Sequence, residues 1–209
     1  MGRLVDAITF PIRALLIHEN SSCGLSSLRD ERMRIVAKDC VGRVLDVGCG
    51  RNNVFVQHFL EQPGSIGIDC FAYDGVDRVV DDMTATGLPD GTFDTITLIA
   101  VGGHIPRSKR EAEFREFGRL LKDGGVLLMT EGEPVTQHIL HRWQRLYYAL
   151  LGKKDMDSER GMLPDEEYCM PRRELLSYLN TSPLKLRRRV RFMWGLNNLY
   201  IAEKRGPPA

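Results

Sequence analysis

Short apolar runs alternate with longer amphipathic segments along most of the chain from Val44 onward. The apolar runs show no regular exchange of polar and apolar positions, which is typical of strands buried on both faces of a parallel sheet. The amphipathic segments have the length of the helices that connect such strands. The pattern therefore predicts an α/β fold with a doubly wound, mostly parallel sheet.

Seven segments are predicted to be strands. Five follow one another over residues 43–47, 65–69, 78–81, 94–100 and 125–130. Residues 184–191 and 199–203 are separated by Gly195 and Asn197–Asn198, which indicate a turn, so they are predicted to form a terminal antiparallel hairpin. Along residues 184–191 the basic side chains share one face, and Leu184, Leu186 and Val190 share the other, interrupted by Arg188. Such charges are typical of an edge strand that resists pairing with another molecule.

Helices are predicted over residues 53–61, 108–122, 134–151 and 172–179. In the second of these, Ser108 and Glu111 have the spacing of a capping box. In the third, the apolar stripe that includes Trp143, Leu146 and Leu150 favours a core contact or a substrate lid over a membrane anchor. The interpretation assigns residues 152–170 to a charged loop.

The first 40 residues precede the sheet and are predicted to form an N-terminal helical cap. They contain two amphipathic segments, 4–17, interrupted at Pro11, and 25–39. Residues 205–209 are expected to be a loose tail. The selectivity for a substrate is expected to reside in the first 40 residues and in residues 134–170, because both lie outside the repeating strand and helix pattern.

Composition restricts the function classes. The 209 residues carry 29 Lys and Arg against 28 Asp and Glu, a formal net charge of +1, so binding to a nucleic-acid backbone is not favoured. The five cysteines are scattered, with no Cys-x-x-Cys pair, so neither a disulfide framework nor a metal site is expected. Reduced cysteines of this kind predict a cytoplasmic location. No apolar run approaches the roughly 18 residues that span a bilayer, and no signal-peptide pattern begins the chain.

The strongest chemical signal lies where the first predicted strand ends, in Val44-Leu45-Asp46-Val47-Gly48-Cys49-Gly50. Glycines let the backbone approach a ligand closely, and the start of the following helix offers unpaired N–H groups. The carboxylate of Asp46 would repel a pyrophosphate but suits a ligand with an ammonium group. A nucleotide-like, partly cationic ligand fits this motif.

The motif resembles the first motif of the class I S-adenosylmethionine-dependent methyltransferases, Asp/Glu-x-Gly-x-Gly-x-Gly. The resemblance extends from about residue 42 to residue 131 and more weakly to residue 204. It implies a methyltransferase domain of the type 11-like kind over residues 41–204, with a seven-stranded Rossmann-like sheet whose seventh strand is antiparallel. Asn52 replaces the third glycine of the family, and Asn tolerates a positive φ better than most residues.

The resemblance also implies the cofactor contacts. Asp46, Gly48, Cys49, Gly50 and Asn52 would lie along the methionine part of S-adenosylmethionine. Asp69, 21 residues after Gly48, would accept hydrogen bonds from both ribose hydroxyls. The adenine would meet Asp82 and Met83, with Asp81 a close alternative, and would be flanked by Cys70 and Phe71; Ala100 completes the expected set.

Candidates for a catalytic base are weaker. His104 follows the fourth predicted strand, and Glu131 follows the fifth, together with Glu133. Both positions lie at the carboxyl ends of strands, where open α/β sheets bind ligands. His138 and His141 are three residues apart on a predicted helix, and a solvated helix face is favoured there over a metal site.

The sequence therefore predicts a methyltransferase that uses S-adenosylmethionine and methylates an O, N or C atom of a small molecule, lipid or sugar. Two alternatives stay open. One is a noncatalytic methyltransferase-like protein that binds the cofactor or a partner protein. The other is an NAD(P)-dependent Rossmann oxidoreductase, which the glycine spacing and Asp46 disfavour. The oligomeric state is left open.

Overall fold

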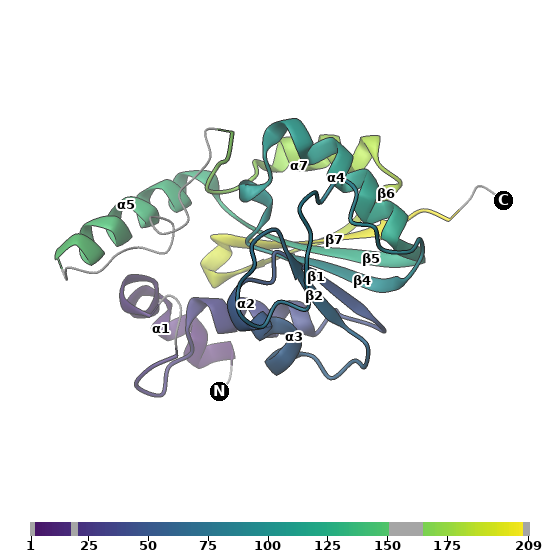
Figure 1. The fold of residues 1–209 in the computed structure, drawn as a ribbon. Coiled ribbons are helices and arrows are strands. Elements are labelled where there is room, and N and C mark those ends of the chain that lie inside the picture. The colour runs from purple at the N-terminus through teal and green to yellow at the C-terminus, as the bar shows by residue number, and fades with distance from the viewer. Residues whose placement is uncertain (1–2, 18–20, 151–164, 207–209) are drawn as a thin grey trace.

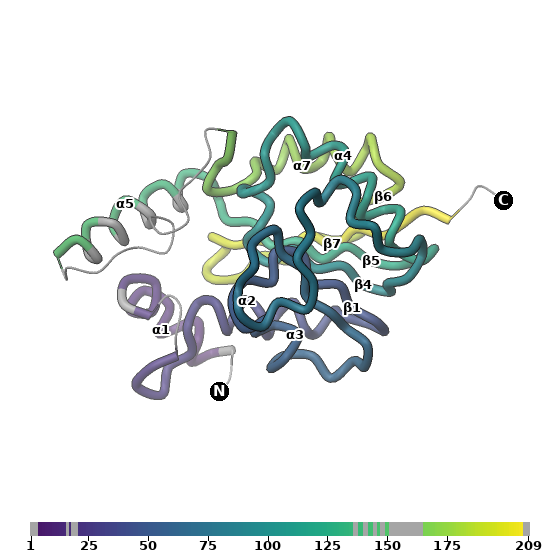
Figure 2. Tube along the Cα trace, viewed as in Figure 1, coloured from purple at the N-terminus to yellow at the C-terminus, as the bar shows by residue number. Residues whose placement is uncertain are grey.

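The computed structural model describes residues 3–17, 21–150 and 165–206 (Figure 1). Its centre is a seven-stranded sheet in the order β3-β2-β1-β4-β5-β7-β6. The parallel strands are β1 (Val44–Val47), β2 (Ile66–Asp69), β3 (Arg78–Val79), β4 (Phe93–Ile99) and β5 (Leu121–Gly132). The antiparallel strands are β7 (Asn197–Lys204), beside β5, and β6 (Leu184–Phe192), at the edge (Figure 2). The predicted doubly wound fold with a terminal antiparallel hairpin is confirmed.

Helices cover both faces of the sheet (Figure 1). On one face, α4 (Arg107–Leu120) packs through Phe114 and α7 (Arg172–Thr181) through Leu175, in one core with strand residues such as Leu45. On the other, α2 (Leu28–Ala37) and α3 (Val54–Phe59) pack through Val36 and Phe55. Because neighbouring strand residues point to opposite layers, both must be apolar, which explains the unbroken apolar runs.

The chain reverses its winding direction between β1 and β4. β1 pairs in parallel with β2 on one side and with β4 on the other. The loops that follow β1 and β4 therefore lead to opposite sides of the sheet, and ligands in open α/β folds bind where such loops separate. This switch point places the motif after β1, Asp69 at the end of β2 and the loop after β4 at one edge.

The expected interruption of the first helix at Pro11 is wrong, because α1 (Arg3–Leu16) runs through that residue. A proline inside a helix cannot donate to the carbonyl four residues earlier, here that of Ala7. The indole Nε1–H of Trp194 donates to this carbonyl instead, at 2.8 Å. The hairpin turn thus supplies the hydrogen bond that the proline withholds.

The predicted capping box at the start of α4 does not form. The helix begins at Arg107, and Pro106 is its N-cap residue. The backbone N–H and the hydroxyl of Ser108 both donate to the carboxylate of Asp165, at 3.2 and 3.0 Å. Asp165, which is distant in sequence, takes the place of the capping box with Glu111, because one of its carboxylate oxygens accepts from both donors of Ser108.

A β-bulge in β6 corrects the predicted facing of its side chains. Leu186 pairs with Ala202, whereas Arg188, two residues on, pairs with Ile201, so Arg187 is an extra residue. Leu184 and Leu186 therefore pack on the α4 side, and Val190 packs on the α2 side instead of joining them.

The helix α5 (Pro134–Leu150) forms as predicted, but Trp143, Leu146 and Leu150 are exposed, so they are not core residues. Most of the predicted charged loop and part of the expected tail lie outside the described residues. In the part of the chain that the structure describes, no helix has both the length and the apolar character needed to cross a membrane. The division into a cap, a domain and a tail stays a prediction.

Candidate functional site

The turn after β1 has the backbone conformation that its glycines permit. Gly48, Gly50 and Asn52 have φ values of +72°, +66° and +62°, a region that glycine and asparagine tolerate. The N–H of Gly48 donates to the carbonyl of Ile68 on β2 at 2.9 Å. A Cβ atom on Gly48 would lie 2.7 Å from the side chain of Val101, in the loop after β4. The motif thus brings the ends of β1, β2 and β4 together.

Asp69 ends β2 and is 6% exposed. Its Oδ2 accepts from the N–H of Gly50 and its Oδ1 from the N–H of Phe71, both at 3.0 Å. A carboxylate offers about four lone pairs, so two acceptor positions are left for a ligand. A Cβ atom built on Gly50 would meet no atom within 4 Å, so the space beside this contact is open. A diol such as that of a ribose fits this arrangement.

Asp46 lies inside β1, beneath the turn, and is 3% exposed. The hydroxyl of Thr97, its partner on β4, donates to Oδ1 at 2.6 Å. Burial raises the pKa of Asp46 to about 7, the hydrogen bond from Thr97 opposes that rise, and the charge of Asp69 adds to it. Asp46 therefore exchanges its proton near neutral pH, so a nearby cation would favour its ionised form.

A second carboxylate supports the turn from outside, and sequence reasoning missed it. Oδ2 of Asp77 accepts from Asn53 Nδ2 at 2.6 Å and from the N–H of Gly67 at 2.7 Å. A Cβ atom on Gly67 would lie 2.2 Å from Asn53, so this β2 position requires glycine. No motif marks Asp77, because its partners are 24 and 10 residues away.

The residues expected around the adenine have separate surroundings. Asp82 is exposed, and its Oδ1 accepts from the N–H of Thr84 at 3.2 Å and from Nζ of Lys109 at 3.3 Å. Met83 packs in part against the α4 side of the core. Cys70 is exposed, whereas Cys49 is buried, and burial raises the pKa of its thiol to about 12. The structure thus joins the residues of the turn and Asp69 by direct contacts, while Asp82 contacts Thr84 and Lys109.

The loop after β4 begins with a strained residue. Ala100 has a φ of +59°, and its N–H donates to the hydroxyl of Thr130 on β5 at 2.9 Å. A non-glycine residue in this region costs on the order of 1 kcal/mol or more and is frequent at functional sites. Ala100 is exposed and lies at the switch point, directly after β4.

Of the three candidate bases, Glu133 pairs with Arg189 of β6 at 2.9 Å, and His104 and Glu131 differ in access. Glu131 is 4% exposed, its Oε2 accepts from the N–H of Met170 at 2.9 Å, and burial raises its pKa to about 8. His104 lies in the turn after β4 and is partly exposed, with Nδ1 3.5 Å from Oε2 of Glu166. Only His104 of the two has a side chain open to solvent.

Arg110 holds the His104 turn and was missed by sequence reasoning. Its guanidinium is fully buried, donates to the carbonyl of Ile105 at 2.9 Å and pairs with Glu174 of α7 at 2.6 Å. The signal that could have found it is its place on the inner face of α4, four residues before Phe114.

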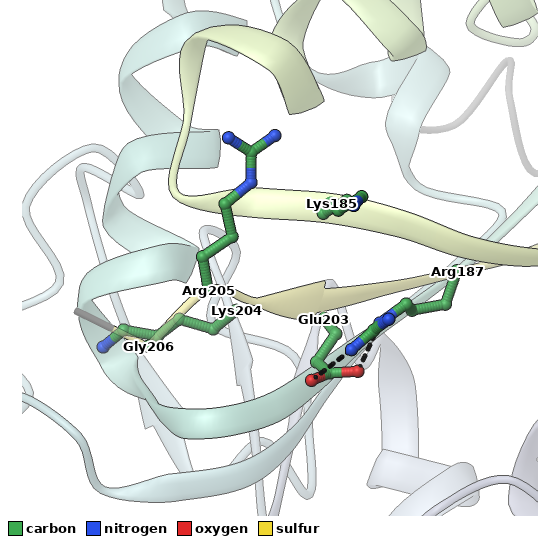
Figure 3. Close-up of a pocket in the computed structure, with 6 residues that line it drawn as sticks. All are labelled: Lys185, Arg187, Glu203, Lys204, Arg205 and Gly206. Carbon is green, nitrogen blue, oxygen red and sulfur yellow. Dashed lines mark hydrogen bonds and ion pairs between the residues drawn. The ribbon is translucent and has the colours of Figure 1, made fainter. Parts of the chain in front are cut away.

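A surface hollow lies away from this edge of the sheet. A hollow of about 450 Å³ is lined by residues at the open end of the hairpin, namely Lys185, Arg187, Glu203, Lys204, Arg205 and Gly206 (Figure 3). It lies at the amino ends of the parallel strands, because Lys204 Nζ contacts the carbonyl of Leu121, where β5 begins. His138 Nδ1 lies 2.9 Å from the carbonyl of Pro134, and the side chain of His141 is outside the described set. Among the described residues, no group of three or more His, Cys, Asp or Glu side chains could hold a metal ion.

Comparison with known proteins identifies the family. The family described as "Methyltransferase domain" matches residues 21–187. A protein of Encephalitozoon cuniculi with the name "Putative methyltransferase" is 34% identical over 90 residues, which are 41% of this chain and 43% of that protein. The chain thus matches less than half the length of that relative.

Solved structures share the fold. The PH0226 protein from Pyrococcus horikoshii has a TM-score of 0.63 at 16% identity, with 90% of this chain and 95% of that one covered. An S-adenosylmethionine-dependent methyltransferase from Methanosarcina mazei has a TM-score of 0.53 at 17% identity, with 82% and 97% covered. The family match spans most of the chain and agrees with the motif after β1. The chain therefore belongs to the methyltransferase domain family.

Proposed function

We propose that this protein transfers the methyl group of S-adenosylmethionine to an O, N or C atom of a small-molecule, lipid or sugar acceptor. One observation carries the proposal: Asp69 is fixed by the N–H of Gly50, has acceptor positions left, and borders open space. We also propose a cytoplasmic location, because the five cysteines are scattered along the sequence without the spacing of a disulfide framework.

The residues at the switch point fit the cofactor. Asp69 would accept from the ribose hydroxyls, and the turn from Gly48 to Asn52 would lie along the methionine part. Asp82 and Met83, with Cys70, would meet the adenine. When bound, the cofactor supplies a methyl group on a sulfonium, which is open to attack by a nucleophile. Asp46 would act from beneath the turn, where its negative charge favours a cationic ligand.

The protein's main contribution would be to hold the acceptor in line with the methyl group. Such positioning can supply up to about 7 to 11 kcal/mol. Residues 165–170 are placed to take part, because the N–H of Glu167 donates to the carbonyl of Gly103 at 2.8 Å, in the loop after β4. This agrees with the expectation that residues 134–170 contribute to selectivity.

Of the three predicted bases, His104 is the one that could take a proton from the acceptor, because its ring is partly open to solvent, whereas Glu133 is paired with Arg189. Glu131 is enclosed, so its contribution would be to position residues 165–170 through the N–H of Met170. Its pKa of about 8 means that it carries a proton at neutral pH. We therefore expect His104→Ala to lower kcat with little change in cofactor affinity.

Two measurements test the proposal. Calorimetric titration with S-adenosylmethionine, and with NADH and NADPH as controls, should show binding of the first compound alone. Incubation with radiolabelled cofactor and fractionated metabolite, lipid and sugar extracts should then show transfer of the label to an acceptor. Binding without transfer to any fraction would favour the noncatalytic alternative, and no binding would refute the proposed cofactor.

A further inference from the structure

The helix α1 buries the charged Asp6 and Arg13 together with Phe10 and Ala14, and it turns its other described large apolar side chains outward. Arg13 is fully buried and pairs with Glu31 of α2 at 2.7 Å, while its Nη1 lies 3.9 Å from the buried Asp6. A helix on a water-covered surface has the reverse arrangement. Ile8 is 69% exposed, and the exposed apolar residues of α1 are Leu4, Val5, Ile8, Ile12 and Leu15. This face therefore has the character of a binding surface.

The helix α5 also exposes large apolar side chains. Its exposed large apolar residues recur at intervals of three or four and form one stripe, namely Val135, Ile139, Trp143, Leu146 and Leu150. His138 and Arg142 are exposed beside the stripe, and the sequence of α5 contains no Asp or Glu. Figure 1 shows α5 extending from the sheet at the end of the molecule where α1 also lies.

Both tryptophans of the chain are exposed in this region. Trp143 belongs to the stripe of α5. Trp194, 64% exposed, is held against α1 by its hydrogen bond to Ala7 and by its ring, whose centre is 5.5 Å from that of Phe10. Tryptophan combines a large apolar ring with a polar N–H and is enriched where membranes meet water.

A groove of about 620 Å³ adjoins α1 on its buried side. Its lining includes the apolar Phe10 and Phe192 and the basic Lys38 and Arg191. The two carboxylates in the lining belong to α1 and α2 and already lie against the guanidinium of Arg13. Lys38 and Arg191 are exposed, so basic side chains lie in the groove behind α1.

We propose that the exposed apolar faces of α1 and α5, with Trp194, form a docking surface for an anionic phospholipid bilayer. Helices that lie in the membrane interface combine an apolar face with Trp and with basic residues that attract anionic headgroups. A second copy of the chain is a poorer occupant, since a two-fold contact through α5 would bring His138 and Arg142 of both copies together without an acid from that helix. The inference is independent of methyl transfer.

Sedimentation with vesicles tests the docking surface. The full chain is mixed with vesicles of phosphatidylcholine and phosphatidylglycerol in equal parts, or of phosphatidylcholine alone. We expect binding to the mixed vesicles, several-fold weaker binding to the neutral ones, and a further decrease at high salt. Ile8→Glu and Ile139→Glu should each weaken binding by about tenfold or more, because they put a carboxylate into the apolar contact.

Val41→Glu is the matched control. Val41 is an exposed apolar residue that precedes β1, so it lies at the amino ends of the parallel strands. Its replacement should leave vesicle binding unchanged. Far-ultraviolet circular dichroism and thermal melting show that each variant is folded. Four results would overturn the inference: no binding of the natural protein to mixed vesicles, equal binding to both vesicle types, undiminished binding of both helix variants, or a dimer that these variants dissociate in place of vesicle binding.

Discussion

Removal of the Asp69 carboxylate is the most direct test of the cofactor site. Asp69→Ala would remove the two hydrogen bonds that we propose Asp69 accepts from the ribose, and we expect their loss to cost about 1.5 to 3 kcal/mol in total, because the acceptor is charged. The affinity for S-adenosylmethionine should therefore fall by about 10-fold to 150-fold. The change also removes the acceptor for the N–H groups of Gly50 and Phe71, so the free energy of unfolding should fall by about 2 to 4 kcal/mol.

The matched control is Asp77→Ala. Asp77 also accepts two hydrogen bonds near the turn, from Asn53 and Gly67, but we assign it no contact with the ligand. The two variants should lose similar stability in urea unfolding, whereas calorimetry at neutral pH should show the large loss of affinity for Asp69→Ala alone. If Asp69→Ala does not fold, Asp69→Asn retains one carbonyl acceptor and can replace it. Equal affinities of the Asp69 variant and the natural protein would refute the assignment, as would equal losses for both variants.

Three further predictions concern stability. Burial raises the pKa of Asp46 from 3.8 to about 7, so the unfolded chain releases this proton at lower pH than the folded one, and the free energy of unfolding falls as the pH rises from about 4 to about 7. The stability of Asp46→Asn relative to the natural protein should therefore increase by up to roughly 4 kcal/mol over this pH range. A stability difference that does not change with pH would contradict this. Gly103→Ala would place a Cβ 2.3 Å from a backbone carbonyl of the segment before α7 and should cost about 1 to 3 kcal/mol in urea unfolding, whereas Gly206→Ala, which meets no atom within 4 Å, should cost nothing measurable. Arg13→Ala would leave the carboxylate of Glu31 without its buried partner and should cost about 3 kcal/mol; a loss below about 1 kcal/mol in the same assay would argue against the inward-facing ion pair.

The repeating pattern of strands and helices was readable from sequence because each buried strand must be apolar on both faces. The glycine turn after β1 was readable for a related reason, since Gly48 and Gly50 need conformations that few residues adopt. The positive φ of Asn52 follows the same logic. These features depend on local chemistry, so the residues themselves carry the information.

Features that depend on distant partners were not readable. Asp165 replaces the capping box at Ser108 from 57 residues away, and Trp194 completes the helix around Pro11. The bulge at Arg187 changes which residues face each layer of the core without any glycine to mark it. The separate environments of His104 and Glu131 also arise from tertiary packing, because both lie at strand ends in the sequence pattern.

The hydrogen bond between Trp194 and Ala7 joins residues that are 187 positions apart. Phe10 of α1 packs in the same small cluster as Met193 of the hairpin turn. Since a chain emerges from the ribosome with its amino end first, α1 is made before the hairpin turn and must wait for the 187 intervening positions before this contact can form. The helix α1 therefore reaches its native position only after the hairpin turn has been made, and during that interval its apolar residues are open to other partners.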